Sequence, residues 1–210
     1  MSRHHCIISG TGRAGTTFLV ELLTRLGLDT GFTEKREGYF PHCSAGMEGY
    51  LCAANAPYIV KSPDLCDYLE DALAEGRFVI DHAYVPIRDL FQAAQSRREV
   101  SARADRAQFP FSVPGGLWHS SNPAHQEMVL SLKLYKLMHA LARHAIPTTL
   151  LYFPRLVRDR SYLYKALTPI LQGIGFAHFE REFRHVAQPQ LIHEFEYQPS
   201  MLHVGRPRGG

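Results

Sequence analysis

The sequence predicts an α/β fold, a three-layer sandwich in which a central parallel sheet lies between two layers of helices. Three observations predict it. Short apolar runs of strand length alternate with longer helical patterns, a glycine-rich turn joins the first apolar run to a helix, and no internal repeat or low-complexity stretch breaks this alternation. With 210 residues, the chain is long enough for one full hydrophobic core, and we expect residues 1–210 to form a single domain.

The first unit is a strand, a glycine-rich turn and a helix. Apolar residues 6–9 predict the strand, Gly10, Gly12 and Gly15 mark the turn, and residues 18–23 begin an amphipathic helix. Because glycine adopts a positive φ without strain, the backbone N–H groups of such a turn can converge on an anion at the positive end of the helix. This order of elements is typical of loops that bind phosphate groups.

The second unit is again a strand followed by a helix. Residues 58–60 predict the strand, Ser62 is expected to cap the helix with Pro63 in its first turn, and Gly76 is expected to end it. Residues 77–85 follow as a third strand, because their apolar runs are long enough for a parallel sheet that is buried on both faces.

The remaining elements continue the alternation. Residues 89–102 predict a helix, residues 122–147 a long helix opened by Asn-Pro, and residues 148–153 the fourth strand. A last helix is expected over residues 161–172, with Pro169 limiting its final turn.

The composition argues against several classes of function. Hydrophobic residues make up 45% and charged residues 20%, as in an ordinary globular protein. No apolar run has the length of a membrane span or forms the core of a signal peptide, so we expect no membrane span and a cytoplasmic protein. The net charge is +3, and no basic run with interleaved aromatics suggests nucleic acid as a partner. The four cysteines and twelve histidines lack the spacing of metal ligands, so no metal site is expected.

The glycine turn differs from the loop of nucleotide hydrolases, G-x-x-x-x-G-K-[ST], in the position of its cation. That loop has a lysine directly after the last glycine, where the ammonium group reaches the outer phosphates. Here Thr16 stands at that position, and the nearest cation is Arg13. The stretch resembles the phosphosulfate-binding loop of the sulfotransferases that use 3′-phosphoadenosine 5′-phosphosulfate (PAPS), in which Lys or Arg precedes a small residue and Gly-Thr-Thr. The resemblance implies that this cofactor binds at Gly12, Arg13, Ala14, Gly15, Thr16 and Thr17.

A second stretch resembles the same family. Arg88 and Asp89 follow the third predicted strand, and Ser96 comes eight residues after Arg88. The sulfotransferases carry R-x-P-x-D-x-x-x-S, or a shortened R-D form, whose arginine and serine grip the 3′-phosphate, so the resemblance implies this role for Arg88 and Ser96. The alternative is a surface ion pair of Arg88 with Asp89. A weaker match is Lys61, followed by Ser-Pro, which resembles the K-[ST]-P or K-T-H segment beside the transferred sulfuryl group.

The resemblance covers about residues 6–96 and implies the P-loop NTPase-like fold of PAPS-dependent sulfotransferases, of the bacterial or carbohydrate type. It implies transfer of a sulfuryl group from PAPS to a hydroxyl or amine of a small-molecule or carbohydrate acceptor, with no metal required. Arg13 is then the cation where charge develops on the leaving oxygen, with help from Lys61.

The chain departs from the family at the general base. Pro63 stands where K-T-H members have their catalytic histidine, and the Y-E-D-L motif after the last strand is lost. Carbohydrate-modifying members without that histidine use a glutamate in the loop after the first helix, and Glu37, shortly before Tyr39 and Phe40, resembles it. Partial burial between aromatic rings would raise the pKa of Glu37 towards a useful value. The other candidates are Glu34, His42, His82 and His119.

The segment 103–122 is irregular and aromatic and is expected to form a lid on the acceptor side. Its Trp118 could stack on an acceptor ring or pack the lid onto the core. Residues 199–210 are expected to be a flexible tail. Two other functions fit the sequence: a small P-loop kinase or NTPase in which Asp81 holds Mg²⁺, and a nucleotide-binding protein without catalysis.

Overall fold

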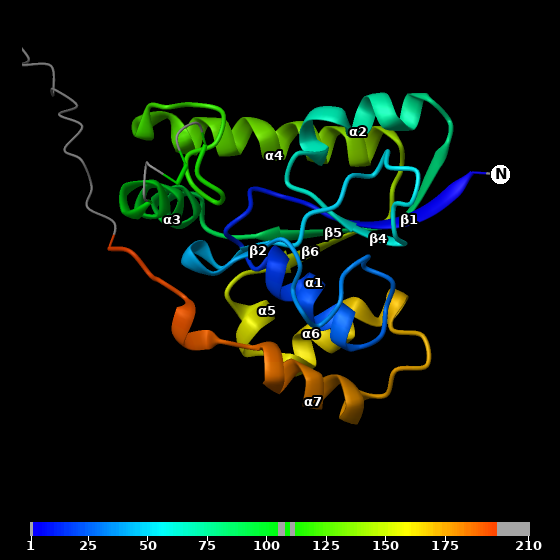
Figure 1. The fold of residues 1–210 in the computed structure, drawn as a ribbon. Helices are drawn as coiled ribbons and strands as arrows, with labels where there is room; N and C mark the ends of the chain where they lie inside the picture. The colour runs from blue at the N-terminus through cyan, green and yellow to red at the C-terminus, as the bar shows by residue number, and fades with distance from the viewer. Residues whose placement is uncertain (1, 105–107, 110–111, 197–210) are drawn as a thin grey trace, which may run out of the picture.

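A computed structural model describes residues 2–104, 108–109 and 112–196 (Figure 1). The predicted tail at 199–210 and two parts of the predicted lid, 105–107 and 110–111, lie outside the described residues. Among the helices in the described ranges, none combines the length and the hydropathy needed to cross a membrane.

The centre of the protein is a sheet of four parallel strands in the order β4-β1-β5-β6 (Figure 1). The strands are β1 (Arg3–Ile8), β4 (Ile59–Lys61), β5 (Phe78–Ile87) and β6 (Thr148–Tyr152). The register pairs Ile8 of β1 with Lys61 on one side and with Tyr84 on the other. The four strands predicted from the sequence are confirmed. Because they are parallel, their carboxyl ends meet at one edge, where ligands bind in open α/β sheets.

Helices cover both faces of the sheet, as predicted for a three-layer α/β fold. Figure 1 shows α2, α3 and α4 on one face and α1, α5, α6 and α7 on the other. The helices are α1 (Thr16–Arg25), α2 (Leu65–Ala74), α3 (Leu90–Arg103), α4 (Gln126–Arg143), α5 (Arg155–Arg158), α6 (Arg160–Leu167) and α7 (Phe176–Val186). Short 3₁₀ turns lie at Pro41–Cys43, Pro123–His125, Thr168–Ile170 and Pro189–Leu191.

The strands are buried on both faces because successive side chains point to opposite sides of the sheet. Ile8 and Tyr84 pack in a hydrophobic cluster with α1, α6 and α7. Ile7 and Val85, one residue along each strand, pack in a second cluster with α2 and α4. All four side chains are fully buried, as the apolar runs of the third predicted strand indicate.

Helices α1, α2, α4 and α6 begin at other residues than the sequence predicts: α1 begins at Thr16, α4 begins at Gln126 after a short 3₁₀ turn and ends at Arg143, and polar side chains account for the starts of α2 and α6. Helix α2 begins two residues beyond Pro63, because the Ser62 hydroxyl accepts the N–H of Asp64 at 3.2 Å in a local turn and does not cap the helix. Helix α6 begins one residue before the expected start, because Asp159 caps it by accepting the N–H of Tyr162 at 2.9 Å. In both places a short polar side chain satisfies a nearby backbone N–H, and the helix starts where that bond allows.

The structure also contains elements that sequence reasoning missed. Helix α7 buries Phe179, Phe183 and Val186, whose spacing of four and three is the signal that could have found it. Phe183 packs edge-on against Phe18 of α1 at 5.6 Å between ring centroids. A small hairpin of β2 (Tyr39–Phe40) and β3 (Ala45–Gly46) lies in the segment expected to be a loop. This hairpin forms one wall of the site described next.

Candidate functional site

The glycine turn connects β1 to α1 through backbone conformations that favour glycine. Gly12 has a φ of 65°, and Gly15, the N-cap of α1, has a φ of 84°. A Cβ on Gly15 would lie 3.0 Å from Leu156 and 3.2 Å from Phe153, so the turn packs too closely for a side chain there. The first N–H groups of α1 have no acceptor within the helix and carry partial positive charge. They lie beside a cavity that the first helical residue, Thr16, helps to line.

This cavity, about 380 Å³ in volume, opens where the carboxyl ends of the strands meet. It brings together most of the residues that the sequence predicts to act on the cofactor or in the reaction. They are Gly12, Arg13, Gly15, Thr16, Thr17, Lys61, Arg88 and Ser96. Ala14 does not line the cavity, because its methyl group is fully buried in the hydrophobic cluster around α1.

The two predicted anion-binding stretches meet at Arg13. The Arg13 Nε donates to the Ser96 hydroxyl at 3.1 Å, and its guanidinium also donates to the carbonyl of Cys43. Arg88 donates to the carbonyl of Arg13 at 3.0 Å and to the carbonyl of His193. Its guanidinium lies 4.9 Å from the centre of the Phe153 ring. Arg88 and Ser96 therefore both face the glycine turn, although they lie 75 and 83 residues after Arg13 in the sequence.

A third arginine, Arg97, belongs to the same site and was missed by sequence reasoning. It is 6% exposed, lines the cavity and donates to the carbonyls of Thr11 and Gly116, both at 2.7 Å. Its Nε is buried without a hydrogen-bond partner. The available signal was its spacing on α3, since Arg97 follows the buried Ala93 and Ala94 by four and three residues and so shares their face.

The site holds positive charge that carboxylates do not balance. In the part of the chain that the structure describes, Arg13, Arg88 and Arg97 form no ion pair with an acidic side chain. Burial lowers the pKa of each guanidinium, and the charge of Arg13 adds to this for Arg88 and Arg97, whose pKa values fall to about 10. Buried charges without counterions are costly. An anion in the cavity would remove much of that cost.

Lys61 ends β4 inside the same cavity and pairs with a glutamate that sequence reasoning did not single out. Its side chain is 3% exposed, and its Nζ donates to the Gly46 carbonyl at 3.0 Å and to Glu48 Oε1 at 2.8 Å. Burial lowers the pKa of Lys61. The Glu48 side chain lines the cavity and is 45% exposed, so one of its sides remains open to a ligand. The sequence carries no motif around Glu48; the hairpin places it.

The predicted base Glu37 lies outside this cavity. Its carboxylate accepts hydrogen bonds from the hydroxyl of Thr33 at 2.6 Å and from the N–H of Thr33 at 3.1 Å. The bond from the Thr33 hydroxyl is the largest cause of a lowered pKa of Glu37. The expected rise of its pKa is therefore wrong, because the carboxylate is exposed and hydrogen-bonded, not buried between rings. The reserve candidate Glu34 forms an ion pair with Arg25 at 2.8 Å, also away from the cavity.

None of the three candidate histidines lines the main cavity. His42 lines a neighbouring cavity of about 320 Å³. His82 lies within β5 and is bonded to Thr149 at 2.8 Å, and His119 lies 3.3 Å from Asp67. Asp67 also forms a group of possible metal ligands with Asp64 and His119, but its carboxylate is already bonded to Lys133 at 2.5 Å. These contacts leave Glu48 as the carboxylate best placed beside Lys61.

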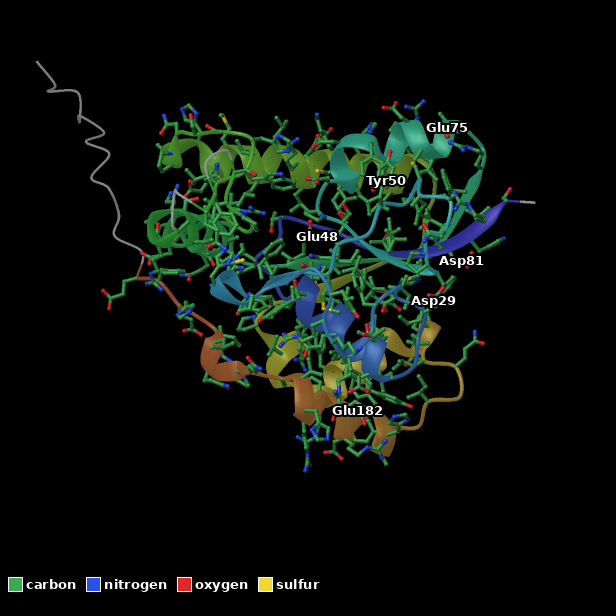
Figure 2. All side chains as sticks on the ribbon, viewed as in Figure 1. Asp29, Glu48, Tyr50, Glu75, Asp81 and Glu182 are labelled. Carbon is green, nitrogen blue, oxygen red and sulfur yellow. The ribbon has the colours of Figure 1, made fainter. Side chains whose placement is uncertain are left out.

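Asp81 does not have the position that a kinase needs for its magnesium ligand. It is bonded to His4 at 2.7 Å and to the Tyr58 hydroxyl at 3.2 Å, and it does not line the cavity. Figure 2 shows Asp81 near the end of the sheet where the chain begins, well apart from Glu48 near the middle of the molecule. A kinase that used this cavity would therefore need another magnesium ligand than Asp81.

Residues 112–118, which belong to the predicted lid, form one wall of the cavity from Ser112 to Trp118. The Trp118 ring has the Arg97 guanidinium at 4.9 Å and the Lys133 ammonium at 5.7 Å from its centre. It also packs against the hydrophobic cluster of Ala93, Ala94 and Leu130. Trp118 thus packs the segment onto the core, which is one of the two expected roles, and it also lines the cavity; stacking on an acceptor ring stays a prediction.

Replacing Gly12 by Ala is expected to destabilise the protein more than replacing Gly27 by Ala. Both glycines have a positive φ, but a Cβ on Gly12 would lie 2.6 Å from Arg97 NH2, whereas a Cβ on Gly27 meets nothing within 4 Å. Arg97 cannot move without weakening a buried hydrogen bond, which predicts an additional loss of about 1–3 kcal/mol in the free energy of unfolding. Urea unfolding of both variants measures this difference. Equal losses would show that the turn tolerates the methyl group.

The arrangement favours a ligand with several anionic groups, held by a glycine turn, three arginines and a lysine. Glu48 is the carboxylate bonded to that lysine, and Glu21 and Asp64 also line the cavity. Such a site can bind a phosphate- or sulfate-bearing molecule and take a proton from a second one. Comparisons of this chain with protein-family models, with curated proteins and with solved structures return no match.

Proposed function

We propose that this protein is a PAPS-dependent sulfotransferase with a P-loop-type fold, which transfers a sulfuryl group to a hydroxyl or amine of a small-molecule or carbohydrate acceptor. One observation carries the proposal. The buried Arg97 and the half-buried Arg13 and Arg88, which form no ion pair with an acidic side chain in the described residues, meet the glycine turn at the start of α1, in one cavity. A donor with a phosphosulfate at one end and a phosphate at the other matches this distribution of charge.

The residues present fit such a donor. The cavity volume of about 380 Å³ lies within the range of small-molecule sites. Gly15 lines the cavity and packs closely against Leu156 and Phe153, so the start of α1 has no room for a Cβ there. Arg88 contacts Arg13 of the turn from the end of β5, and Ser96 contacts it from α3, which allows one ligand to span the turn and this pair.

On the donor side, the residues hold negative charge. The backbone of residues 13–17 and the hydroxyls of Thr16 and Thr17 would hold the phosphosulfate, and Arg88 with Ser96 would hold the 3′-phosphate. Arginine suits this task because its planar fork binds phosphate and sulfate through two parallel hydrogen bonds. Arg13, which lies between these two groups, would neutralise charge on the oxygen that leaves.

On the acceptor side, Glu48 replaces Glu37 as our candidate for the general base. When bound, PAPS supplies a sulfuryl group on a phosphate oxygen. Glu48 would take the proton of the acceptor hydroxyl as the acceptor oxygen bonds to sulfur and the bond from sulfur to the phosphate oxygen breaks. Lys61, 2.8 Å from Glu48, would stabilise the negative charge that the phosphate oxygen gains. The pair therefore places the base and a cation on one reacting centre.

The alternatives remain distinct in what they bind. A small-molecule kinase would require a different magnesium ligand, because Asp81 lies away from the cavity. A nucleotide-binding protein without catalysis would use the same arginines and leave Glu48 without a role.

Nucleotide binding without a metal tests the proposal. In EDTA, adenosine 3′,5′-bisphosphate should raise the melting temperature and bind in calorimetry, because a ligand of the native state stabilises it by mass action. Adenosine 5′-phosphate should bind more weakly, and ATP should gain little from Mg²⁺. A preference for ATP with Mg²⁺ would instead support a kinase. Labelled PAPS with a panel of phenols and glycans then separates catalysis from binding alone.

A further inference from the structure

Arg97 connects two segments that form different walls of the cavity. Through NH2 it donates to Thr11 in the glycine turn, and through NH1 it donates to Gly116 in the 112–118 segment. One helical turn further along α3, the Ser101 hydroxyl accepts the N–H of Leu117 at 2.8 Å. The 112–118 segment is thus attached to α3, and α3 is attached to the glycine turn through Arg97 and through the bond from Arg13 to Ser96; of these links, Arg97 alone also holds Gly116 among the described residues.

The Arg97 guanidinium packs closely against the glycine turn. A Cβ on Gly12 would come within 2.6 Å of Arg97 NH2, so the backbone of the turn lies directly against the guanidinium. On its other side, the guanidinium lies 4.9 Å from the centre of the Trp118 ring. A shift of Arg97 therefore has to be transmitted to the 112–118 segment, because interiors packed this closely do not absorb a displacement.

The charge of Arg97 makes this connection responsive to a ligand. Among the described residues its guanidinium has carbonyl acceptors but no ion pair with an acidic side chain, and its Nε has no partner. An anion at the glycine turn would attract the guanidinium more strongly than the neutral carbonyls do. Occupation of the turn thus changes the forces on the residue that holds Gly116.

We infer that Arg97 is a positioning residue that couples anion binding at the glycine turn to the placement of the 112–118 wall. The inference rests on the proposed function in one respect: the acceptor is taken to bind against this wall. A bound donor would then order the acceptor side of the cavity before the acceptor arrives. The coupling is reciprocal, so an ordered wall also strengthens anion binding.

Trp118 reports on this wall directly because the chain contains one tryptophan. We expect adenosine 3′,5′-bisphosphate to change Trp118 emission with the same saturation as its binding in calorimetry. Arg97→Met should abolish the emission change at saturating ligand. Arg97→Lys should recover part of it, since one ammonium keeps the charge but does not reproduce the fork to both carbonyls. Lys133→Met is the matched control, because Lys133 is the other cation beside the ring and should not be needed for the response.

The outcomes separate the coupling from the donor assignment. Binding of the bisphosphate to the native protein without an emission change would overturn the coupling. An emission change that persists in Arg97→Met would also overturn it, because the ligand would then affect the Trp118 ring by direct contact. If the bisphosphate does not bind, pyrophosphate and sulfate are the probes: an emission change that depends on Arg97 keeps the coupling while rejecting the proposed donor. If none of these anions binds, both proposals fail.

Hydrogen exchange gives a measure that needs no variant. In the native protein, saturating bisphosphate, or the anion that binds in its place, should slow amide exchange in residues 112–118 by about tenfold, within the usual range of coupling between sites. Unchanged exchange there, with protection confined to the glycine turn, would contradict the inference even if Arg97→Met fails to fold.

Discussion

Replacing Glu48 by Gln should lower turnover by about 10²–10⁴-fold, the usual contribution of a general base. The amide keeps the shape of the side chain and an oxygen that can accept from Lys61 Nζ, so the buried lysine retains a partner. What the variant loses is the ability to take a proton. The measurement is the rate of sulfuryl transfer from labelled PAPS to an acceptor found by the phenol and glycan screen, together with the affinity for adenosine 3′,5′-bisphosphate, which should stay unchanged.

Glu37→Gln is the matched control for this prediction. Glu37 is exposed and bonded to Thr33, outside the cavity, so its replacement should leave turnover near that of the native protein. If Glu37→Gln lowers turnover and Glu48→Gln does not, the base belongs to the loop after the first helix, as the sequence resemblance implies, and that loop must rearrange when ligands bind.

Replacing Arg88 by Ala should weaken binding of adenosine 3′,5′-bisphosphate by about 10–100-fold, because a hydrogen bond to a charged group contributes about 1.5–3 kcal/mol. Binding of adenosine 5′-phosphate, which lacks the 3′-phosphate, should change much less. Calorimetry with both nucleotides measures the difference. Equal losses for the two would show that Arg88 supports the glycine turn through the Arg13 carbonyl and does not recognise the 3′-phosphate.

Arg158→Ala is a suitable control for the Arg88 variant. Arg158 forms an ion pair with Glu194 at 2.9 Å, and Arg88 donates to the neighbouring His193, so both arginines hold the same C-terminal segment. Arg158 does not line the cavity. Its loss should therefore leave both nucleotide affinities nearly unchanged. A matching loss of affinity would trace the effect to the segment, not to a contact between Arg88 and the ligand.

Several features of the site could be predicted because they depend on neighbours in the sequence. Gly12 and Gly15 have the positive φ that their positions in the turn indicate, and a helix follows the turn as predicted, although it begins at Thr16, before the predicted start. The eight residues from Arg88 to Ser96 are a local spacing along α3, and the structure places both side chains at Arg13. Local sequence patterns carry such information because backbone conformation and helical periodicity are set within a few residues.

The carboxylate that we propose as the base and the third arginine could not be predicted in this way. Glu48 lies beside Lys61 only because the β2–β3 hairpin folds back over the end of β4, and no motif surrounds it. Arg97 was passed over because charged residues in helices are usually solvated, yet its face of α3 is buried. Glu37, which the resemblance implies as the base, accepts a hydrogen bond from Thr33 and lies outside the cavity.

From the sequence alone follow the four strands of the sheet, the conformation of the glycine turn, and the positions of Lys61 and Arg88 at strand ends, but not α7 or the β2–β3 hairpin. Tertiary structure alone decided which of these charges share a cavity and which carboxylate joins them: Arg97 reaches Thr11 across 86 residues, and Arg88 reaches His193 across 105. The physical reason is that such pairs are fixed by the packing of helices on a sheet, a sum of many weak contacts along the whole chain, whereas turns and periodicities follow from the steric limits of a few adjacent residues.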